Sequence, residues 1–409
     1  MLNIAILHYS CPTIVGGVEE IVRQQASLLY RHYHRVKILA GRGDKFTDDY
    51  PIELNPRLDS QNPEITKLQP DPAKYEFQIL EITGEIFTYL QNSLQQFDIL
   101  IAHNVLTMPY NLPLTMALHR LANQRVIRVI SWNHDSPYFY PDNHGNFTDQ
   151  AWSILKKYNP NIFYITISDF RAAEFQTLYK IDDVISVIPD GIDPGRFFRL
   201  DPMSIRLIRE EDLFNAHLLL VQPSRIHPRK NIELSIRVIK ALNDIGIKAR
   251  LLLTGAHDPH EKNSRDYHLH LRKLAASLGV NDDIIVVAEH QFKSGQKIPS
   301  NRVTMRDLYH IADLLFLPSK IEGFGIPLLE AGMIKLPIAC ADIPPFRFIA
   351  GDDVCYFSLD DQPEDIAQKI VAFLEKLRPH RMFRNVIKNY VWENIYRESL
   401  LPFLEKVMV

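Results

Sequence analysis

Two glutamates, Glu322 and Glu330, enclose seven residues within a glycine-containing stretch at 318–332. An apolar run just before the stretch predicts a buried parallel strand, and residues 326–333 predict a helix packed on one face. A glycine turn between a strand and a helix N-terminus offers backbone N–H groups and the positive end of a dipole to an anion. Two acids disfavour an anion unless they bind another part of the same ligand, such as sugar hydroxyls. The spacing alone fits equally well a capping acid and a solvated helix acid.

A second group of candidates lies in segment 222–231, where a predicted strand is followed by a helix. Arg225 offers a planar fork of donors and Lys230 a compact charge, which together suit two neighbouring phosphates. A solvated basic loop would have the same composition, so this segment becomes a phosphate-site candidate only in combination with 318–332. Arg229 is expected to be an ordinary surface residue.

Polar residues also follow the predicted strands in the first half of the chain. His134 and Asp135 come after one strand, with Tyr138 just beyond, and flat aromatic faces suit sugar rings. A lone histidine is more often structural, and these neighbours could instead cap a helix. Arg171 follows the next strand and could contact an acceptor or a phosphate, although an ordinary helix arginine is the commoner case. We take His134 as the best site candidate in this half.

Glycines mark two further turns between a strand and a helix. Gly16 and Gly17 follow the first predicted strand, and Gly255 ends the second strand of the second half. A glycine in such a turn either relieves backbone strain or lets a ligand approach the backbone.

Short apolar runs alternate with helix-like segments along the whole chain. The predicted strands are 4–8, 36–40, 98–102, 126–131, 162–167 and 184–188, then 217–221, 250–253, 284–288, 314–317, 338–341 and 354–357. Strands that are apolar on both faces and separated by helices are typical of parallel, doubly wound sheets. The sequence therefore predicts an α/β fold with two Rossmann-like domains that face a cleft between them.

A cluster of turn-forming residues at 189–194 separates the two halves. A chain of 409 residues is too long for one ordinary core, whereas two domains of about 200 residues fit the usual domain size. We expect an N-terminal domain at 1–190, completed by a C-terminal helix at 391–409, and a C-terminal domain at 191–390.

The composition argues against several classes of protein. A net charge of −3 gives no basic field for nucleic acid. The apolar runs are strand-length, far short of the roughly 20 residues that span a membrane, and no secretory signal precedes the first strand. Cys11, Cys340 and Cys355 form no CxxC pair, and the histidines within 257–270 fit no zinc spacing. We therefore expect a cytoplasmic enzyme without a metal site.

The stretch E-G-F-G-I-P-L-L-E-A resembles the retaining, nucleotide-sugar-dependent glycosyltransferases of family 4, which have the GT-B fold. In that family the loop between the two glutamates lies against the donor sugar and diphosphate. The resemblance implies that Glu322 contacts sugar hydroxyls, that Glu330 holds the ribose, and that Gly323, Phe324 and Gly325 bind the donor.

The basic segment resembles the family's S-R-x4-K element, which implies that Arg225 and Lys230 neutralise the leaving nucleoside diphosphate. Catalysis without a metal needs such a pair, because no Mg²⁺ then balances the developing charge. His134 matches a strand-end histidine that faces the donor sugar. Gly255 resembles a glycine near the diphosphate, and residues 289–290 lie where the family seats the nucleobase.

Weaker elements of the same resemblance lie in the first half. Gly16 and Gly17 match a glycine pair that lets the backbone approach the acceptor and the donor diphosphate, respectively. Asp135, Tyr138 and Arg171 would then line the acceptor.

We expect a retaining hexosyltransferase that moves a hexosyl group from a UDP- or GDP-hexose to a hydroxyl of a small sugar, sugar phosphate or polyol derivative. The resemblance implies no metal or other cofactor and no nucleic acid partner. Asp190, where the family often has asparagine, is a mild departure. Three rivals stay open: a transferase for lipid-linked or surface polysaccharide, with peripheral membrane contact, a GT-B UDP-sugar epimerase, and a catalytically silent sugar-nucleotide sensor. The sequence leaves the base, sugar, acceptor and oligomeric state open.

Overall fold

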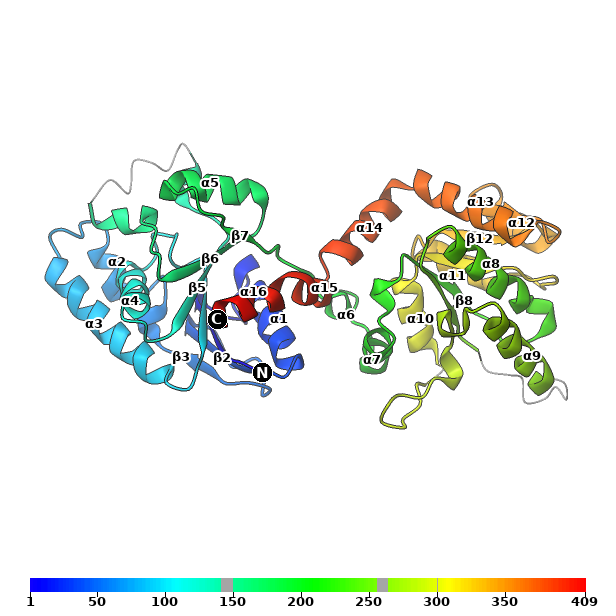
Figure 1. Ribbon diagram of the computed structural model, residues 1–409, viewed down its shortest axis with the longest axis horizontal. Helices are drawn as coiled ribbons and strands as arrows, with labels where there is room; N and C mark the ends of the chain where they lie inside the picture. The colour runs from blue at the N-terminus through cyan, green and yellow to red at the C-terminus, as the bar shows by residue number, and fades with distance from the viewer. Residues whose placement is uncertain (141–149, 256–263, 300) are drawn as a thin grey trace. The chain divides into compact units, whose positions relative to one another are not determined.

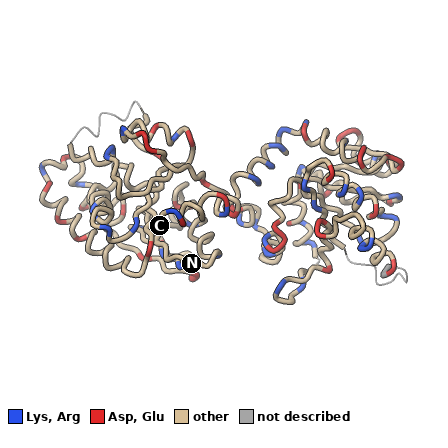
Figure 2. Tube along the Cα trace, viewed as in Figure 1, with Lys and Arg blue, Asp and Glu red and all other residues tan. Residues whose placement is uncertain are grey.

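The computed structural model describes residues 1–140, 150–255, 264–299 and 301–409, which divide into two compact units (Figure 1). The N-terminal unit comprises Met1–Ile192 and Tyr390–Val409, and the C-terminal unit comprises Asp193–Asn389. Acidic and basic residues are interspersed along both units in Figure 2, as a net charge of −3 leads one to expect.

The N-terminal unit contains a seven-stranded parallel sheet in the order β3-β2-β1-β4-β5-β6-β7. Its strands are β1 (Asn3–Ser10), β2 (Arg35–Arg42), β3 (Ile52–Leu54), β4 (Ile99–His103), β5 (Arg128–Asn133), β6 (Ile162–Thr166) and β7 (Ser186–Val187). The strand order runs outwards in both directions from β1 and β4, which makes the sheet doubly wound. Ligands of such sheets bind beyond the carboxyl ends of the strands, where the order reverses.

Helices cover both faces of this sheet (Figure 1). They are α1 (Gly17–Arg31), α2 (Pro63–Leu68), α3 (Glu76–Ser93), α4 (Leu112–Asn123), α5 (Asp169–Tyr179), α15 (Trp392–Ile395) and α16 (Leu401–Met408). Apolar side chains of α1, α15 and α16 share one core with alternate residues of β1 and β4, whereas α3, α4 and α5 share the other. Strand residues that are buried on both faces explain why the runs in the sequence are apolar throughout.

The C-terminal unit contains a six-stranded parallel sheet in the order β10-β9-β8-β11-β12-β13. Its strands are β8 (Leu218–Gln222), β9 (Ala249–Leu253), β10 (Ile284–Val286), β11 (Leu314–Leu317), β12 (Ile338–Ala341) and β13 (Cys355–Phe357). Its helices are α6 (Pro194–Phe197), α7 (Pro202–Glu210), α8 (Ile232–Asp244), α9 (Ser264–Ser277), α10 (Arg302–Ile311), α11 (Ile326–Met333), α12 (Pro344–Ala350), α13 (Pro363–Lys376) and α14 (Arg378–Asn389). A doubly wound parallel sheet is therefore present in both units, which confirms the predicted fold class of two Rossmann-like domains.

The C-terminal segment differs from the single helix expected at 391–409. Val391 forms a parallel bridge with Ile192, in which Ile192 N–H donates to the carbonyl of Tyr390 at 2.7 Å. The segment then continues as α15, a π-helical turn at Tyr396–Leu400, and α16. Trp392 is almost completely buried in the core of the N-terminal unit, so tertiary packing sets the path of the segment.

Two predicted strands are shorter than expected by at least two residues, and one strand was not predicted. The strand at 184–188 is reduced to the two residues of β7, and that at 284–288 ends at Val286 because Val287–Glu289 forms a 3-10 turn. β3 was missed because it is a three-residue edge strand whose side chains are only partly buried. Such a strand has too few apolar residues to give a periodic signal.

Candidate functional site

The turns after β8 and β9 approach each other closely in the C-terminal unit. The N–H of Gly255 donates to the carbonyl of Ser224 at 3.2 Å. A Cβ at position 255 would lie 2.5 Å from that oxygen and 2.8 Å from Cα of Arg225, so only glycine fits without a backbone shift. This contact places Gly255 against the turn that carries Arg225, whose side chain is exposed. Both residues were predicted to bind the donor, and the structure brings them together.

Lys230 and Glu322 form an ion pair, although the sequence assigned them separate roles on phosphate and sugar. Oε1 of Glu322 also accepts a hydrogen bond from the hydroxyl of Ser319 at 2.8 Å. Both charged side chains are largely buried, with exposed fractions of 12% for Lys230 and 13% for Glu322. β8 and β11 are neighbours in the sheet, which explains why the segments after them meet.

Arg229 lies at the surface, as the sequence predicted, but it also belongs to this cluster. Its guanidinium Nη1 lies 3.2 Å from Oε2 of Glu322, and its carbonyl accepts a hydrogen bond from the N–H of Lys320 at 2.8 Å. Its side chain is nevertheless 46% exposed, which is the feature that the sequence prediction captured. Its position beside Lys230 in the basic segment was the signal that could have identified it.

The electrostatics of this cluster favour ionised Glu322. Burial raises the pKa of Glu322, but hydrogen bonds from Lys230 and Ser319, and the charges of Lys230 and Arg229, lower it by more. The net effect is a pKa below the usual value. Because one carboxylate faces two cations here, and Arg225 lies in the same turn region, the cluster keeps a positive excess that suits an anion.

Glu330 lies on α11 and accepts a hydrogen bond from the hydroxyl of Tyr309 at 3.0 Å. Burial, together with the charge of Glu330, raises the pKa of Tyr309 well above its usual value, so Tyr309 stays a hydrogen-bond donor. The two glutamates of the motif therefore have different partners, and the sequence did not indicate the partner of Glu330.

The glycine turn before α11 has the geometry that its sequence predicted. Gly325 is the N-cap with φ of +119°, a conformation that L side chains rarely adopt, and a Cβ there would lie 3.2 Å from the ring of Phe346. Gly323 has open space around it, and Phe324 is 51% exposed. The turn thus presents backbone and an aromatic side chain to the surface of the C-terminal unit.

A hollow of about 260 Å³ lies beside the edge strand of the C-terminal sheet. Its apolar lining includes Ile226, Leu253 and Leu271, and its polar lining includes Glu289 and His290. Ile226 directly follows Arg225 in the chain, so the hollow adjoins the basic turn. Residues 289–290 were expected near the nucleobase, and they line this hollow.

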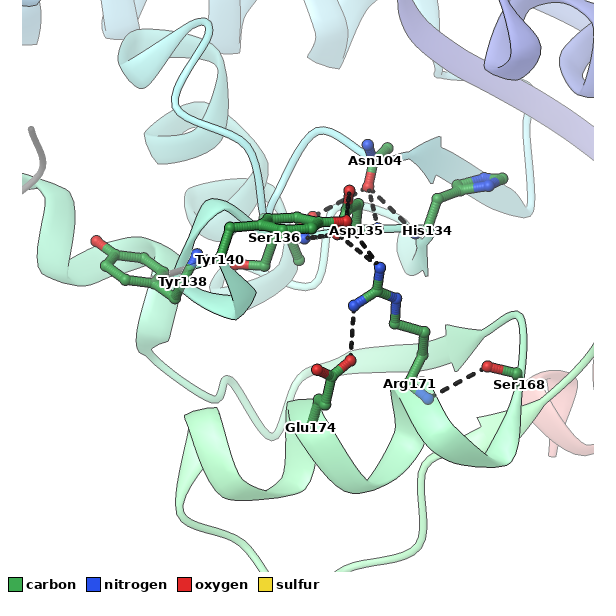
Figure 3. A network of polar contacts seen from close by, with 10 residues as sticks. Asn104, His134, Asp135, Ser136, Tyr138, Tyr140, Ser168, Arg171 and Glu174 are labelled. Carbon is green, nitrogen blue, oxygen red and sulfur yellow. Dashed lines mark hydrogen bonds and ion pairs between the residues drawn. The ribbon is translucent and has the colours of Figure 1, made fainter. Parts of the chain in front are cut away.

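Acceptor candidates of the N-terminal unit form one polar network (Figure 3). The guanidinium of Arg171 lies 3.2 Å from Oδ1 of Asp135 and 2.6 Å from Oε2 of Glu174, and it donates to the hydroxyl of Tyr140 at 3.0 Å. The hydroxyl of Tyr140 in turn donates to Oδ2 of Asp135 at 2.9 Å. Asn104 fixes the start of this loop, because its side-chain oxygen accepts the backbone N–H of Asp135 at 3.0 Å.

The charge of Arg171 is already balanced within this network. Burial lowers the pKa of Arg171, but hydrogen bonds with Glu174 and Tyr140, and the charges of Asp135 and Glu174, raise it above its usual value. Glu174 was missed in the sequence, although it stands one helical turn after Arg171 on α5, where such pairs form. Tyr138 does not join the ion pairs; the ammonium of Lys156 lies 4.7 Å from its ring centroid.

His134 is buried, and both of its ring nitrogens have protein partners. Nδ1 lies 3.1 Å from Oδ2 of Asp190, and Nε2 lies 3.1 Å from Nδ1 of His103. Nε2 of His103 contacts Oε1 of Gln25 at 2.8 Å. Burial and the neighbouring histidines hold the pKa of His103 far below its usual value, and burial lowers that of His8 to about 4. A sugar hydroxyl could bind a ring nitrogen of His134 only by displacing Asp190 or His103.

The glycine pair at the start of α1 has two different environments. Gly16 is the N-cap with extended backbone, and a Cβ there would overlap the carboxylate of Glu19, which accepts a hydrogen bond from the hydroxyl of Ser10 at 2.6 Å. Gly17 has open space on its Cβ side. The roles predicted for this pair, in binding the acceptor and the donor, remain predictions.

The described part of the chain lacks two features. Within residues 1–140, 150–255, 264–299 and 301–409, no group of three or more His, Cys, Asp and Glu could hold a metal ion. Over the same residues, no helix is long and apolar enough to cross a membrane. The histidines at 257 and 260 lie outside the described residues.

Comparison with known families covers both units. Residues 15–196 match the model described as Glycosyltransferase Family 4, and residues 205–389 match the model described as Glycosyl transferases group 1. Two Rossmann-like domains with these matches define a glycosyltransferase of the GT-B class. The chain belongs to the family 4 glycosyltransferases, which confirms the resemblance seen in its motifs.

Individual relatives are distant in sequence. The mannosylglucosylglycerate synthase of Thermotoga maritima is 25% identical over 388 residues, which are 88% of this chain and 86% of the relative. The D-inositol 3-phosphate glycosyltransferase of Actinosynnema mirum is 30% identical over 182 residues, 44% of this chain and 40% of the relative. Among solved structures, a sucrose-phosphate synthase from Thermosynechococcus elongatus aligns over 99% of both chains with 14% identity and a TM-score of 0.43.

Proposed function

We propose that this glycosyltransferase moves a hexosyl group from a UDP- or GDP-hexose to a hydroxyl of a small sugar, sugar phosphate or polyol derivative, with retention of anomeric configuration. The observation that carries the proposal is the pairing of Arg229 and Lys230 with Glu322 beyond the carboxyl ends of β8 and β11, with Arg225 exposed in the same turn after β8. Cations and a carboxylate in one place suit a ligand that combines a diphosphate with sugar hydroxyls.

Within this proposal, the donor diphosphate takes over the positive charges that Glu322 now balances. Lys230 exchanges its ion pair with Glu322 for the diphosphate, and Arg225 contacts the neighbouring phosphate. Glu322 then accepts hydrogen bonds from the sugar hydroxyls, and Glu330 binds the ribose beside Tyr309. The base occupies the hollow beside Glu289 and His290.

Leaving-group stabilisation is the chemistry that these residues supply. Negative charge develops on the departing diphosphate, and preorganised cations at that point lower the barrier more than they stabilise the bound substrate. Retention would follow if the acceptor attacks from the face that the diphosphate leaves, with a phosphate oxygen accepting the proton of the acceptor hydroxyl. We propose that no metal is required, because Arg225 and Lys230 supply the charge.

The acceptor side of the proposal rests on the N-terminal unit. Asp135, Tyr140 and Arg171 offer a carboxylate, a hydroxyl and a guanidinium in one network, which suits polar, hydroxyl-rich compounds. The names of the relatives point the same way, since they refer to glycerate- and inositol phosphate-containing compounds. We place Gly16 and Tyr138 at the edge of this region. His134 is proposed to act on the donor sugar, in exchange for one of its present partners.

The direct test is to incubate the purified protein with UDP-, GDP- and ADP-hexoses, with and without EDTA, and with panels of small sugars, sugar phosphates and polyols. We expect one donor to release its nucleoside diphosphate only when an acceptor is present, at the same rate with EDTA. The anomeric proton of the product should show retention in its NMR spectrum. Donor consumption without an acceptor requirement, or an inverted product, would contradict the proposal.

A further inference from the structure

The hollow beside β10 has the size and walls of a site for one planar ring system. Its volume of about 260 Å³ is slightly below the roughly 300–1,000 Å³ of sites that hold a whole drug-sized ligand. Leu253 comes from the end of β9, and Leu271 and Ala275 from one face of α9, so apolar side chains line the interior. The next residue after Arg225 also lines it, so a base bound here would lie beside the proposed diphosphate site.

The polar side of the hollow combines a hydrogen-bond acceptor, the carboxylate of Glu289, with the hydrogen-bond donors of Arg272. Oε2 of Glu289 lies 3.3 Å from Nη2 of Arg272 and 3.3 Å from Nε2 of His268. Arg272 also donates from Nε to Nε2 of His268 at 3.1 Å, so the guanidinium is held in place from two sides. The side chain of Glu289 is 23% exposed and can be reached by a ligand. A carboxylate therefore stands directly beside a guanidinium at the rim of the hollow.

Of the bases carried by UDP-, GDP- and ADP-hexoses, guanine alone matches both oxygens of a carboxylate and a guanidinium next to it. Guanine presents two adjacent donors, the N1–H and the exocyclic amine, followed by two acceptors, O6 and N7. An ionised carboxylate only accepts hydrogen bonds and an arginine only donates them, so this order is fully complementary. Uracil offers one N–H between two carbonyls, and adenine one amine between two ring nitrogens, so either base places an acceptor against the carboxylate.

We propose that Glu289 selects guanine, with Arg272 beside it, so that the donor is a GDP-sugar rather than a UDP- or ADP-sugar. The inference rests on the proposed function, because it takes the hollow as the base site of the donor. It goes further in naming the base and the residue that recognises it. It also explains why Glu289 is fixed by Arg272 and His268 instead of extending into solvent.

The test is calorimetric titration of the full-length protein with GDP, UDP, ADP and xanthosine diphosphate. We expect wild type to bind GDP at least about 10-fold more tightly than the other three, the lower end of the discrimination given by a bidentate contact to a base. Glu289→Gln should weaken the binding of GDP by about 10-fold to 100-fold and strengthen the binding of xanthosine diphosphate by about 10-fold. Xanthine carries a carbonyl in place of the exocyclic amine, so the glutamine amide can donate to that carbonyl while its oxygen accepts from N1–H.

A matched control is Glu375→Gln, the same acid-to-amide change at an exposed residue of α13 that does not line the hollow. It should leave the ratio of GDP to xanthosine diphosphate affinity unchanged. Tighter binding of UDP or ADP to wild type, or an unchanged ratio in Glu289→Gln, would overturn the inference and leave the proposed function standing. Binding of none of the four to folded wild type would overturn both.

Discussion

In the N-terminal unit, carboxylates outnumber guanidinium groups in the polar network, whereas around Glu322 in the C-terminal unit the cations are in excess. Asp135 and Glu174 together hold Arg171 in the first unit. Lys230 and Arg229 together hold Glu322 in the second. The same sheet architecture thus carries opposite charge balances at the ends of its strands. We infer that the C-terminal unit is built for the anionic part of the substrates and the N-terminal unit for hydroxyl groups.

The largest effect is expected from Lys230→Ala. Loss of this cation should lower turnover by about 10²- to 10³-fold, as removal of one preorganised donor does in other enzymes, and should weaken nucleoside diphosphate binding. Steady-state kinetics and calorimetry measure the two effects. Lys240→Ala on α8, an exposed lysine with an acidic partner, is the matched control. Wild-type affinity in Lys230→Ala would remove the basis for an anion site here.

Glu322→Gln should separate binding from turnover. We expect a fall in turnover of about 10- to 100-fold, because the sugar loses a positioning contact. Affinity for the free diphosphate should stay equal or rise, because Lys230 no longer has to leave a carboxylate. A parallel loss of both quantities would show that Glu322 acts only by supporting the fold of the cluster.

Gly255→Ala tests the close approach of the two turns in the C-terminal unit. The added Cβ would meet backbone atoms of residues 224 and 225, so we expect a loss of about 1–3 kcal/mol in the free energy of unfolding and weaker diphosphate binding. Gly84→Ala, within α3 and with open space around it, is the control and should be neutral or slightly stabilising. Scanning calorimetry measures the change in stability of both variants.

Arg171→Met should affect only the N-terminal unit. Removing the guanidinium leaves Asp135 and Glu174 without their cation, which we expect to cost about 1–2 kcal/mol. All three tryptophans of the chain, Trp132, Trp152 and Trp392, belong to this unit, so tryptophan fluorescence during urea unfolding follows it selectively. Diphosphate affinity should not change. Lys67→Met, an exposed lysine on α2, controls for loss of a surface cation.

The smallest effect concerns pH. The pKa of Glu322 is lower in the folded protein than its usual value of 4.5, so its contribution to stability is present above about pH 4.5 and is lost as the pH falls through the lower folded value. The difference in the free energy of unfolding between wild type and Glu322→Gln, measured by calorimetry, should therefore shrink as the pH falls below 4.5. The expected change is about 1 kcal/mol or less. Melting curves that diverge further as the medium is acidified would contradict this sign.

The fold was largely accessible from the sequence because buried parallel strands are apolar on both faces. β8, β9, β11 and β12 were each predicted within one residue of their observed ends. β3 and the bridge at the start of the C-terminal segment could not be predicted in this way. The first has too few residues for a pattern, and the second joins Ile192 to Val391, which are far apart in the sequence.

The candidate site was accessible as residue types but not as contacts. Motifs identified Lys230 and Glu322, yet they are about ninety residues apart, and only the pairing of β8 with β11 brings them together. The pairing of β5 with β6 does the same for Asp135 and Arg171. A single sequence does not contain the order of strands in a sheet, so these partners had to come from the structure.

The covering of the N-terminal sheet by α15 and α16 has a consequence for biosynthesis. Residues 1–192 leave the ribosome well before Trp392 and Leu404, which complete the core on one face of their sheet. Domains generally fold as they emerge, at about 5–20 residues per second, so the C-terminal unit is made while that face is still uncovered. A nascent chain of this protein therefore carries an unfinished apolar surface for some 10 to 40 seconds, estimated from that rate. Truncation that removes α16 would permanently expose the part of this surface that Leu404 and Val407 cover.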